Sequence, residues 1–212
     1  MAELNNGPLG GISGKLGNMV ASNWRDISYL RAKGKRSKND PTDKQKIVRE
    51  KFKMMFDFLI QIKRIVELGF KNKYTGRSTA YHHAVKKNMA AFKGTYPDLE
   101  IDLALIEISA GYLLPCSGPE MVPDAEGDLT VKWDDQGSIE NQEPSDEATV
   151  VLYSEEKKLH AVYVGAQRSE LEMLVTLPKS FSGDTVHGYI FFTDVTGKLN
   201  SKSIYMGSVK IP

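Results

Sequence analysis

The spacing of the apolar residues changes near residue 98, and this change divides the chain into two unlike regions. Before it, apolar side chains recur every three or four residues, which is typical of amphipathic helices. After it, they alternate in short runs separated by glycine, proline and acidic residues, which is typical of strands. We therefore predict an α+β fold: a glycine-rich arm, β-hairpin and basic linker over 1–41, an antiparallel helical hairpin over 42–98, and an antiparallel β-sandwich over 99–212.

The strongest helical signal begins at Asp40-Pro41, where an N-cap residue precedes a proline suited to the first helical position. Gly69 supplies a natural end about 28 residues later, a length of roughly 42 Å. A second helix is predicted over 78–92, joined to the first by the short connection 71–77. The apolar seam of the first helix, with spacings of four and three, consists of Val48, Phe52, Met55, Leu59, Ile62 and Val66, widened by Phe56, Phe58 and Ile65.

Seven short strands are predicted in the second region. They cover 100–108, 128–134, 148–154, 158–164, 170–177, 186–194 and 202–211. Seven strands with turn sequences at this spacing are typical of an immunoglobulin-like or fibronectin type III-like sandwich. Trp133 is the natural core aromatic of such a domain. A disulfide-bonded immunoglobulin domain is excluded, because Cys116 is the only cysteine and is expected to be a small buried residue at a strand end.

The first forty residues offer apolar groups on a backbone that cannot bury them locally. Residues 5–18 contain five glycines and one proline among fourteen residues, a composition that cannot hold a helix. Over 18–34, β-branched and aromatic residues flank a polar tip at 22–23 or 25–26, which predicts a short β-hairpin. A basic linker then leads to the first helix.

Charge is distributed unevenly along the chain. Residues 1–100 contain 20 Lys and Arg against 9 Asp and Glu, whereas residues 101–212 contain 8 against 18. Opposite potentials at the two ends of a chain steer copies toward one another head to tail. The alternative is that the surfaces of the two regions differ in charge without any role in association.

No motif for catalysis or cofactor binding is complete. Gly10 through Lys15 has the glycine–lysine spacing of a phosphate-binding loop, but Leu16 occupies the position of the required Ser or Thr. His82 and His83 are adjacent, so on a helix they point about 100° apart and cannot chelate one ion. We therefore predict a protein that is not an enzyme and has no cofactor and no metal site.

Two weaker possibilities stay open. The acidic loops over 124–135 and 140–147 are rich in oxygen ligands but lack the EF-hand spacing, so calcium binding is undecided. The segment 31–53 holds ten Lys and Arg against three acidic residues, which suits nonspecific phosphate contacts, but a solvated linker and helix face explains it better. His160 and His187 stand singly in predicted strands and indicate no site.

Three stretches carry a resemblance to a known family. The opening GPLGGISGKLGNMVASNWRDISYLR, the segment DPTDKQKIVREKF and the segment GTYPDLEIDLALIEIS, together with LTVKWDD, cover most of the chain. They resemble a family of uncharacterised proteins from Bacteroidota-type bacteria, a domain of unknown function with an N-terminal GPxGGxSGKxGN signature. The resemblance implies a helical first half and a sandwich-like second half, and it implies no activity.

These features favour a structural protein that self-associates through its N-terminal arm, as a subunit of a filament, surface appendage or phage-like particle. The expected partner is a second copy bound head to tail. The arm residues expected to make the contact are Leu9, Ile12, Leu16, Val20, Trp24, Ile27, Tyr29 and Leu30. The alternatives are a module whose sandwich recognises a glycan or protein, and a basic nucleic-acid-associated protein.

Location is not predicted from the sequence. No run of about 18 uncharged apolar residues occurs, and no basic segment followed by an apolar one opens the chain. We therefore expect no membrane span and no classical secretory signal. Synthesis in the cytoplasm, followed by non-classical export or incorporation into a particle, would fit this pattern.

Overall fold

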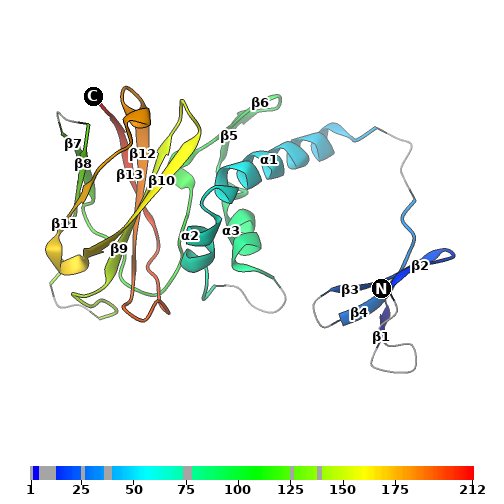
Figure 1. Ribbon diagram of the computed structural model, residues 1–212. Coiled ribbons are helices and arrows are strands. Elements are labelled where there is room, and N and C mark those ends of the chain that lie inside the picture. Colours follow the sequence, from blue (N-terminus) through cyan, green and yellow to red (C-terminus); the bar gives the residue numbers. More distant parts are fainter. Residues whose placement is uncertain are drawn as a thin grey trace. The chain divides into compact units, whose positions relative to one another are not determined.

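A computed structural model describes the backbone of residues 2–4 and the whole of residues 13–24, 27–35, 40–73, 78–124, 127–137 and 140–212. The chain forms two compact units, Met1–Thr42 and Asp43–Pro212 (Figure 1). The sequence boundary expected at residues 98 and 99 lies inside the second unit. Mixed α+β content is confirmed, with strands predominating. None of the described helices is long and apolar enough to cross a membrane.

The first unit contains one four-stranded antiparallel sheet in the order β1-β4-β3-β2. Its strands are β1 (Ala2–Leu4), β2 (Gly14–Leu16), β3 (Met19–Trp24) and β4 (Ile27–Ala32). The predicted hairpin pairing is confirmed: β3 pairs with β4, and the last described pair is Trp24 with Ile27. The predicted tip at residues 25 and 26 lies outside the described residues. Part of the glycine-rich arm joins this sheet, because β2 pairs with β3.

The long first helix was predicted as one element, and the structure corrects this. It is divided into α1 (Asp43–Ile60) and α2 (Lys63–Gly69). Ile62 lies between them outside helical geometry, with φ −107° and ψ 26°. Leu59 and Val66, one on each side of the break, are both buried. The end at Gly69 is as predicted, whereas the beginning lies at Asp43 and not next to Asp40.

The second helix is shorter than predicted. α3 (Ala80–Asn88) begins at Thr79, whose hydroxyl oxygen accepts a hydrogen bond from the His82 backbone N–H at 3.2 Å. The predicted last turn instead opens a hairpin of β5 (Phe92–Thr95) and β6 (Asp98–Ile101). Gly94 does not end the helix but lies in β5 with φ +80°, where an added Cβ would lie 2.2 Å from the Asp98 carbonyl oxygen.

Seven strands follow and form two antiparallel sheets. The four-stranded sheet has the order β10-β9-β12-β13, and the three-stranded sheet has the order β11-β8-β7. The strands are β7 (Glu120–Pro123), β8 (Leu129–Lys132), β9 (Glu147–Ser154), β10 (Leu159–Gln167), β11 (Glu172–Val175), β12 (Thr185–Thr193) and β13 (Ile204–Lys210). Six of the seven predicted strands are present.

The first of the seven strands was misplaced. The predicted strand over 100–108 stops at Ile101 and continues as a short 3₁₀ turn, Leu103–Leu105. The strand that completes the three-stranded sheet is β7, which lies in the segment read as a turn because of its prolines and glycines. β7 is an edge strand, where Pro123 needs to donate no ladder hydrogen bond.

The second unit has three layers: helices, the four-stranded sheet and the three-stranded sheet (Figure 1). The two central strands β9 and β12 are buried on both faces. Val151 and Phe191 point toward the helices, whereas Val150 and Ile190 point toward the three-stranded sheet. Trp133 is buried in this second core, 5.7 Å from the Phe192 ring, as predicted.

Candidate assembly surfaces

One face of the small N-terminal sheet carries four of the eight predicted assembly residues. Opposed residues on paired strands share a face, so the register places Val20 beside Arg31, and Tyr29 and Trp24 along the same face. Ile27 pairs with Trp24 and completes this set. We call Val20, Trp24, Ile27 and Tyr29 the arm face.

The arm face is bordered by positive charge. Lys15 of β2 pairs with Val20, which in turn pairs with Arg31 of β4, so the three residues form a row across the sheet. Both basic side chains are exposed. An apolar and aromatic face therefore lies next to two cations.

The opposite face of this sheet carries the remaining described assembly residues. Leu16, 62% exposed, pairs with Met19, and Leu30 pairs with Ala21. Ala21 is the only buried residue within the described ranges 13–24 and 27–35. Leu9 and Ile12 lie outside the described residues. The sheet therefore has little core of its own.

A second exposed apolar surface lies on α1. Val48, Phe52, Phe56 and Ile60 are 59%, 48%, 37% and 39% exposed, at spacings of four residues. Phe52 and Phe56 stack with ring centroids 6.2 Å apart. The predicted seam is thus divided, because its residues from Met55 onward are buried whereas Val48 and Phe52 remain exposed.

A groove of about 430 Å³ lies on the other side of α1, between this helix, β6 and the end of β9. We call it the α1–β6 groove. Its apolar lining comes from Met54, Phe58, Leu99, Ile101, Leu103 and Tyr153. Its charged lining consists of three carboxylates, Asp57, Glu100 and Glu155, and one cation, Lys158. It is therefore an apolar groove with an acidic rim.

His160 lies behind this groove, between two aromatic rings. Its ring centroid is 4.6 Å from that of Phe58 and 4.7 Å from that of Tyr153. Its Nδ1 is 3.2 Å from Oε1 of Gln61, a groove residue, and its buried Nε2 has no hydrogen-bond partner among the described residues. Burial lowers the pKa of His160 to about 4, so the imidazole is neutral at physiological pH.

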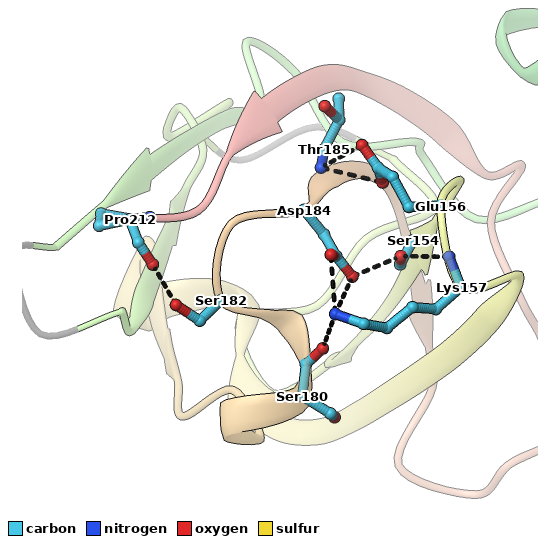
Figure 2. A network of polar contacts seen from close by, with 8 residues as sticks. All are labelled: Ser154, Glu156, Lys157, Ser180, Ser182, Asp184, Thr185 and Pro212. Atoms are coloured by element: carbon cyan, nitrogen blue, oxygen red, sulfur yellow. Dashed lines mark hydrogen bonds and ion pairs between the residues drawn. The ribbon is translucent and has the colours of Figure 1, made fainter.

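A polar network around Asp184 ties the turn between β9 and β10 to the start of β12 (Figure 2). Lys157 Nζ donates to both carboxylate oxygens of Asp184, at 2.7 and 2.8 Å, and the Ser154 hydroxyl donates to Oδ2 at 2.7 Å. The hydrogen bond from Lys157, helped by that from Ser154, lowers the pKa of Asp184. Ser154 is buried, and its hydroxyl hydrogen is already donated to the Asp184 carboxylate. We therefore assign the network a structural role: it stabilises the turn between β9 and β10.

A pocket of about 500 Å³ between the 133–146 loop and the end of β10 contains the buried Arg168. Its Nε lies 3.3 Å from Oδ2 of the buried Asp146, and its guanidinium carbon lies 3.8 Å from the centre of the Phe192 ring. The Trp133 indole N–H donates to the Arg168 carbonyl at 2.9 Å. Arg168 is therefore held by an ion pair, by the Phe192 ring and by hydrogen bonds from its guanidinium to Gln136 and to the Leu114 carbonyl, which indicates a structural role.

The other residues considered in the sequence occupy structural positions. Lys15 lies in a β-strand and not at the start of a helix, as a phosphate loop would require. Cys116 is buried, as predicted, but in a loop, and burial raises the pKa of its thiol to about 12. His187 Nδ1 lies 2.8 Å from the Tyr205 hydroxyl. Among the described residues, no group of three His, Cys, Asp or Glu could hold a metal ion.

Residues 11–207 match a family of unknown function, DUF6266, and the chain belongs to this family. The match extends over both units and includes most of the N-terminal sheet. No curated protein matches the chain. The arm face, the exposed face of α1 and the α1–β6 groove are therefore interpreted from their own chemistry.

Sequence reasoning found the arm residues but missed the groove. The arm residues stood out because they are apolar and lie among glycines. The groove combines Met54, Leu99 and Tyr153, which are far apart in the sequence, so only the folded chain brings them together. The one available signal was the charge difference between the two halves.

Proposed function

We propose that the protein is a non-enzymatic assembly subunit that associates with copies of itself through the Met1–Thr42 sheet. A filament, a surface appendage or a phage-like particle is the kind of structure it would build. The observation that carries the proposal is the arm face, four large apolar side chains on a sheet in which only Ala21 is buried among residues 13–24 and 27–35. A sheet with so little core of its own gains stability when another surface covers its exposed apolar side chains.

The energetic argument is simple. A large apolar side chain contributes about 1.5–3 kcal/mol when it is fully buried, and Trp24 is 48% exposed in the single chain. Aromatic residues and arginine dominate the binding energy of protein interfaces, and both occur on the arm face or at its border. An arm that covers a neighbouring subunit would bury these groups without requiring a new fold.

The charge distribution favours a head-to-tail arrangement. Residues 1–42 carry seven Lys and Arg against three Asp and Glu, whereas residues 99–212 carry eight against nineteen. Contact between unlike ends makes a heterologous interface, which produces rings or open filaments. A two-fold dimer through two arms would instead bring like charges together.

The sandwich would serve as the body of the subunit. Lettered in chain order as A, B, C, C′, E, F and G, the strands β7 to β13 form one sheet of A, B and E and another of C′, C, F and G. We propose on this basis that it is an immunoglobulin-like domain of the fibronectin type III kind. This assignment adds no binding partner by itself, because such sandwiches serve many functions.

The test is the mass of the protein in solution. Light scattering after size exclusion should give a mass for residues 1–212 that rises with concentration and falls with added salt, since screening weakens the charge term. Residues 43–212 should be folded and monomeric under the same conditions. A full-length chain that is a salt-insensitive monomer over the micromolar range would exclude assembly and favour the module that recognises a glycan or protein.

A further inference from the structure

We propose that Trp24 of one copy inserts into the α1–β6 groove of a second copy, with Lys15 and Arg31 facing the acidic rim. This inference rests on the proposed function and names the two surfaces that meet. It assigns a binding role to groove residues that come from α1, the β5–β6 hairpin and the end of β9. The occupant is a second copy of this chain.

The groove suits an indole in size and in chemistry. Its volume of about 430 Å³ exceeds that of a single side chain, and its lining includes Met54, Phe58 and Leu99. Thioether and aromatic groups make favourable contacts with an aromatic ring. Trp24 is the last described residue of β3 and is 48% exposed, so part of its indole surface is accessible to a second copy.

The charges around the two surfaces are complementary. Asp57, Glu100 and Glu155 line the groove with only Lys158 as a cation. Glu100 lies 3.4 Å from Lys93, so part of the rim charge is already balanced. Asp57 is exposed on α1 and adds negative charge directly beside the apolar lining.

The arm presents its cations at a suitable position. Lys15 and Arg31 lie in the row of Val20, on the same face as Trp24 and four residues from it along β3. Four residues of a strand span roughly 13 Å. An indole in the groove would therefore leave both cations at the border of the contact, where charge pairs guide orientation. Arginine also pairs with carboxylates through two parallel hydrogen bonds.

Two charge-reversed proteins test this contact, each a full chain. The groove variant carries Asp57→Lys and Glu100→Lys, and the arm variant carries Lys15→Glu and Arg31→Glu. All four side chains are exposed, so both variants should fold. Each variant alone should lose at least tenfold in association, measured by sedimentation velocity over a concentration series. Mixing the two should restore assembly, because the unchanged arm of the groove variant meets the unchanged groove of the arm variant, and the reversed arm meets the reversed groove with opposite charges.

Matched substitutions elsewhere control for general effects. Glu170→Lys with Glu172→Lys reverses two exposed charges on the other sheet, and this variant should assemble like the original chain. Trp24→Ala should weaken association at least tenfold, whereas Tyr112→Ala, which removes another exposed aromatic ring, should not. Circular dichroism checks that each protein is folded.

The outcomes separate the groove from assembly as such. If the original chain assembles and the groove variant assembles equally well, the groove assignment is wrong while self-association through the arm stands. If the mixture of variants gains no mass although each was impaired, the arm does not reach the groove of another copy, which also overturns the assignment. If the original chain stays monomeric throughout, both proposals fail.

Discussion

Phe58 of α1 and Tyr153 of β9 meet with ring centroids 4.8 Å apart and ring planes inclined by 64°. Both rings are buried, and this edge-to-face contact joins the helical layer to the four-stranded sheet. The helices therefore cover a sheet face that would otherwise be apolar and exposed.

The first prediction concerns fragments. Residues 43–212 should fold and melt cooperatively, whereas residues 99–212 alone should aggregate or remain unfolded. Without the helices, the second fragment exposes Val151, Tyr153, Tyr189 and Phe191, which are all buried in the helix-facing core. Circular dichroism melting of the two fragments provides the measurement. Equal, cooperative melting of both would show that the helices contribute nothing to this core.

The second prediction concerns the other core. Trp133→Ala should reduce the free energy of unfolding by about 3–5 kcal/mol, as truncation of a large buried aromatic residue does. It removes the packing on Phe192 and leaves the Arg168 carbonyl without the indole donor. Urea unfolding of the 43–212 fragment gives this value. A loss below about 1 kcal/mol would contradict the packing described.

The third prediction concerns pH and His160. Its pKa is about 4 in the folded protein and about 6.5 in an unfolded chain. Above pH 6.5 the imidazole is neutral in both the folded and the unfolded chain, so its protonation does not reduce the stability of the fold. As the pH falls from 6.5 toward 4, only the unfolded chain binds the proton, so stability is lost, by about 2 kcal/mol at pH 5.

A variant isolates this effect from the titration of other groups. His160→Phe keeps an aromatic ring between Phe58 and Tyr153 but cannot bind a proton. The difference in unfolding free energy between pH 7 and pH 5 should be smaller in this variant than in the original chain. His82→Phe makes the same substitution at an exposed histidine and serves as the matched control. An unchanged pH dependence in His160→Phe would contradict the prediction.

The fourth prediction concerns Asp184 and the turn it holds. Asp184→Asn should lower the urea midpoint, because the amide cannot accept the paired hydrogen bonds from Lys157 as a carboxylate does. The lowered pKa means that this contribution is present above the ordinary carboxyl pKa and is lost as the pH falls through the folded value. Asp98→Asn, at an exposed position of β6, is the control. Equal midpoints for both variants at pH 7 would count against the network.

The fifth prediction concerns Gly111. A Cβ at this position would lie 1.6 Å from the Asn200 carbonyl oxygen, which also accepts a hydrogen bond from Leu113. Gly111→Ala should therefore destabilise the second unit by at least about 2 kcal/mol. A Cβ at Gly34 would have no atom within 4 Å, so the Gly34→Ala protein should melt like the original chain. If Gly111→Ala left the melting temperature unchanged, the segments around Gly111 and Asn200 would be able to move apart without a cost in free energy.

Much of the fold could be predicted because its signals are local. The pairing of β3 with β4, the end of α2 at Gly69 and six of the seven strands predicted in the second region follow from turn residues and short apolar runs. The break at Ile62 could not be predicted, because no proline or glycine marks it. It depends on the shape of the sheet surface against which Leu59 and Val66 pack.

The helical layer and the groove depend on long-range contacts. The β9 sequence EATVVLYS contains the continuous apolar run VVLY, which does not distinguish a strand covered on both faces from a buried helical segment. In the same way, nothing near Met54 in the sequence indicates that Leu99 and Tyr153 lie beside it. The arm residues were identifiable, but which of them share a face depended on the register of β3 and β4.

The burial of β9 and β12 on both faces limits how the sequence of this domain can vary within the family. Successive residues of each strand belong to different cores, so inserting or deleting one residue would send every following side chain into the wrong core. Substitutions can accumulate one at a time in such strands, whereas changes of length cannot. Variation in length within this family should therefore be confined to the loops and to the edge strands β7, β10, β11 and β13.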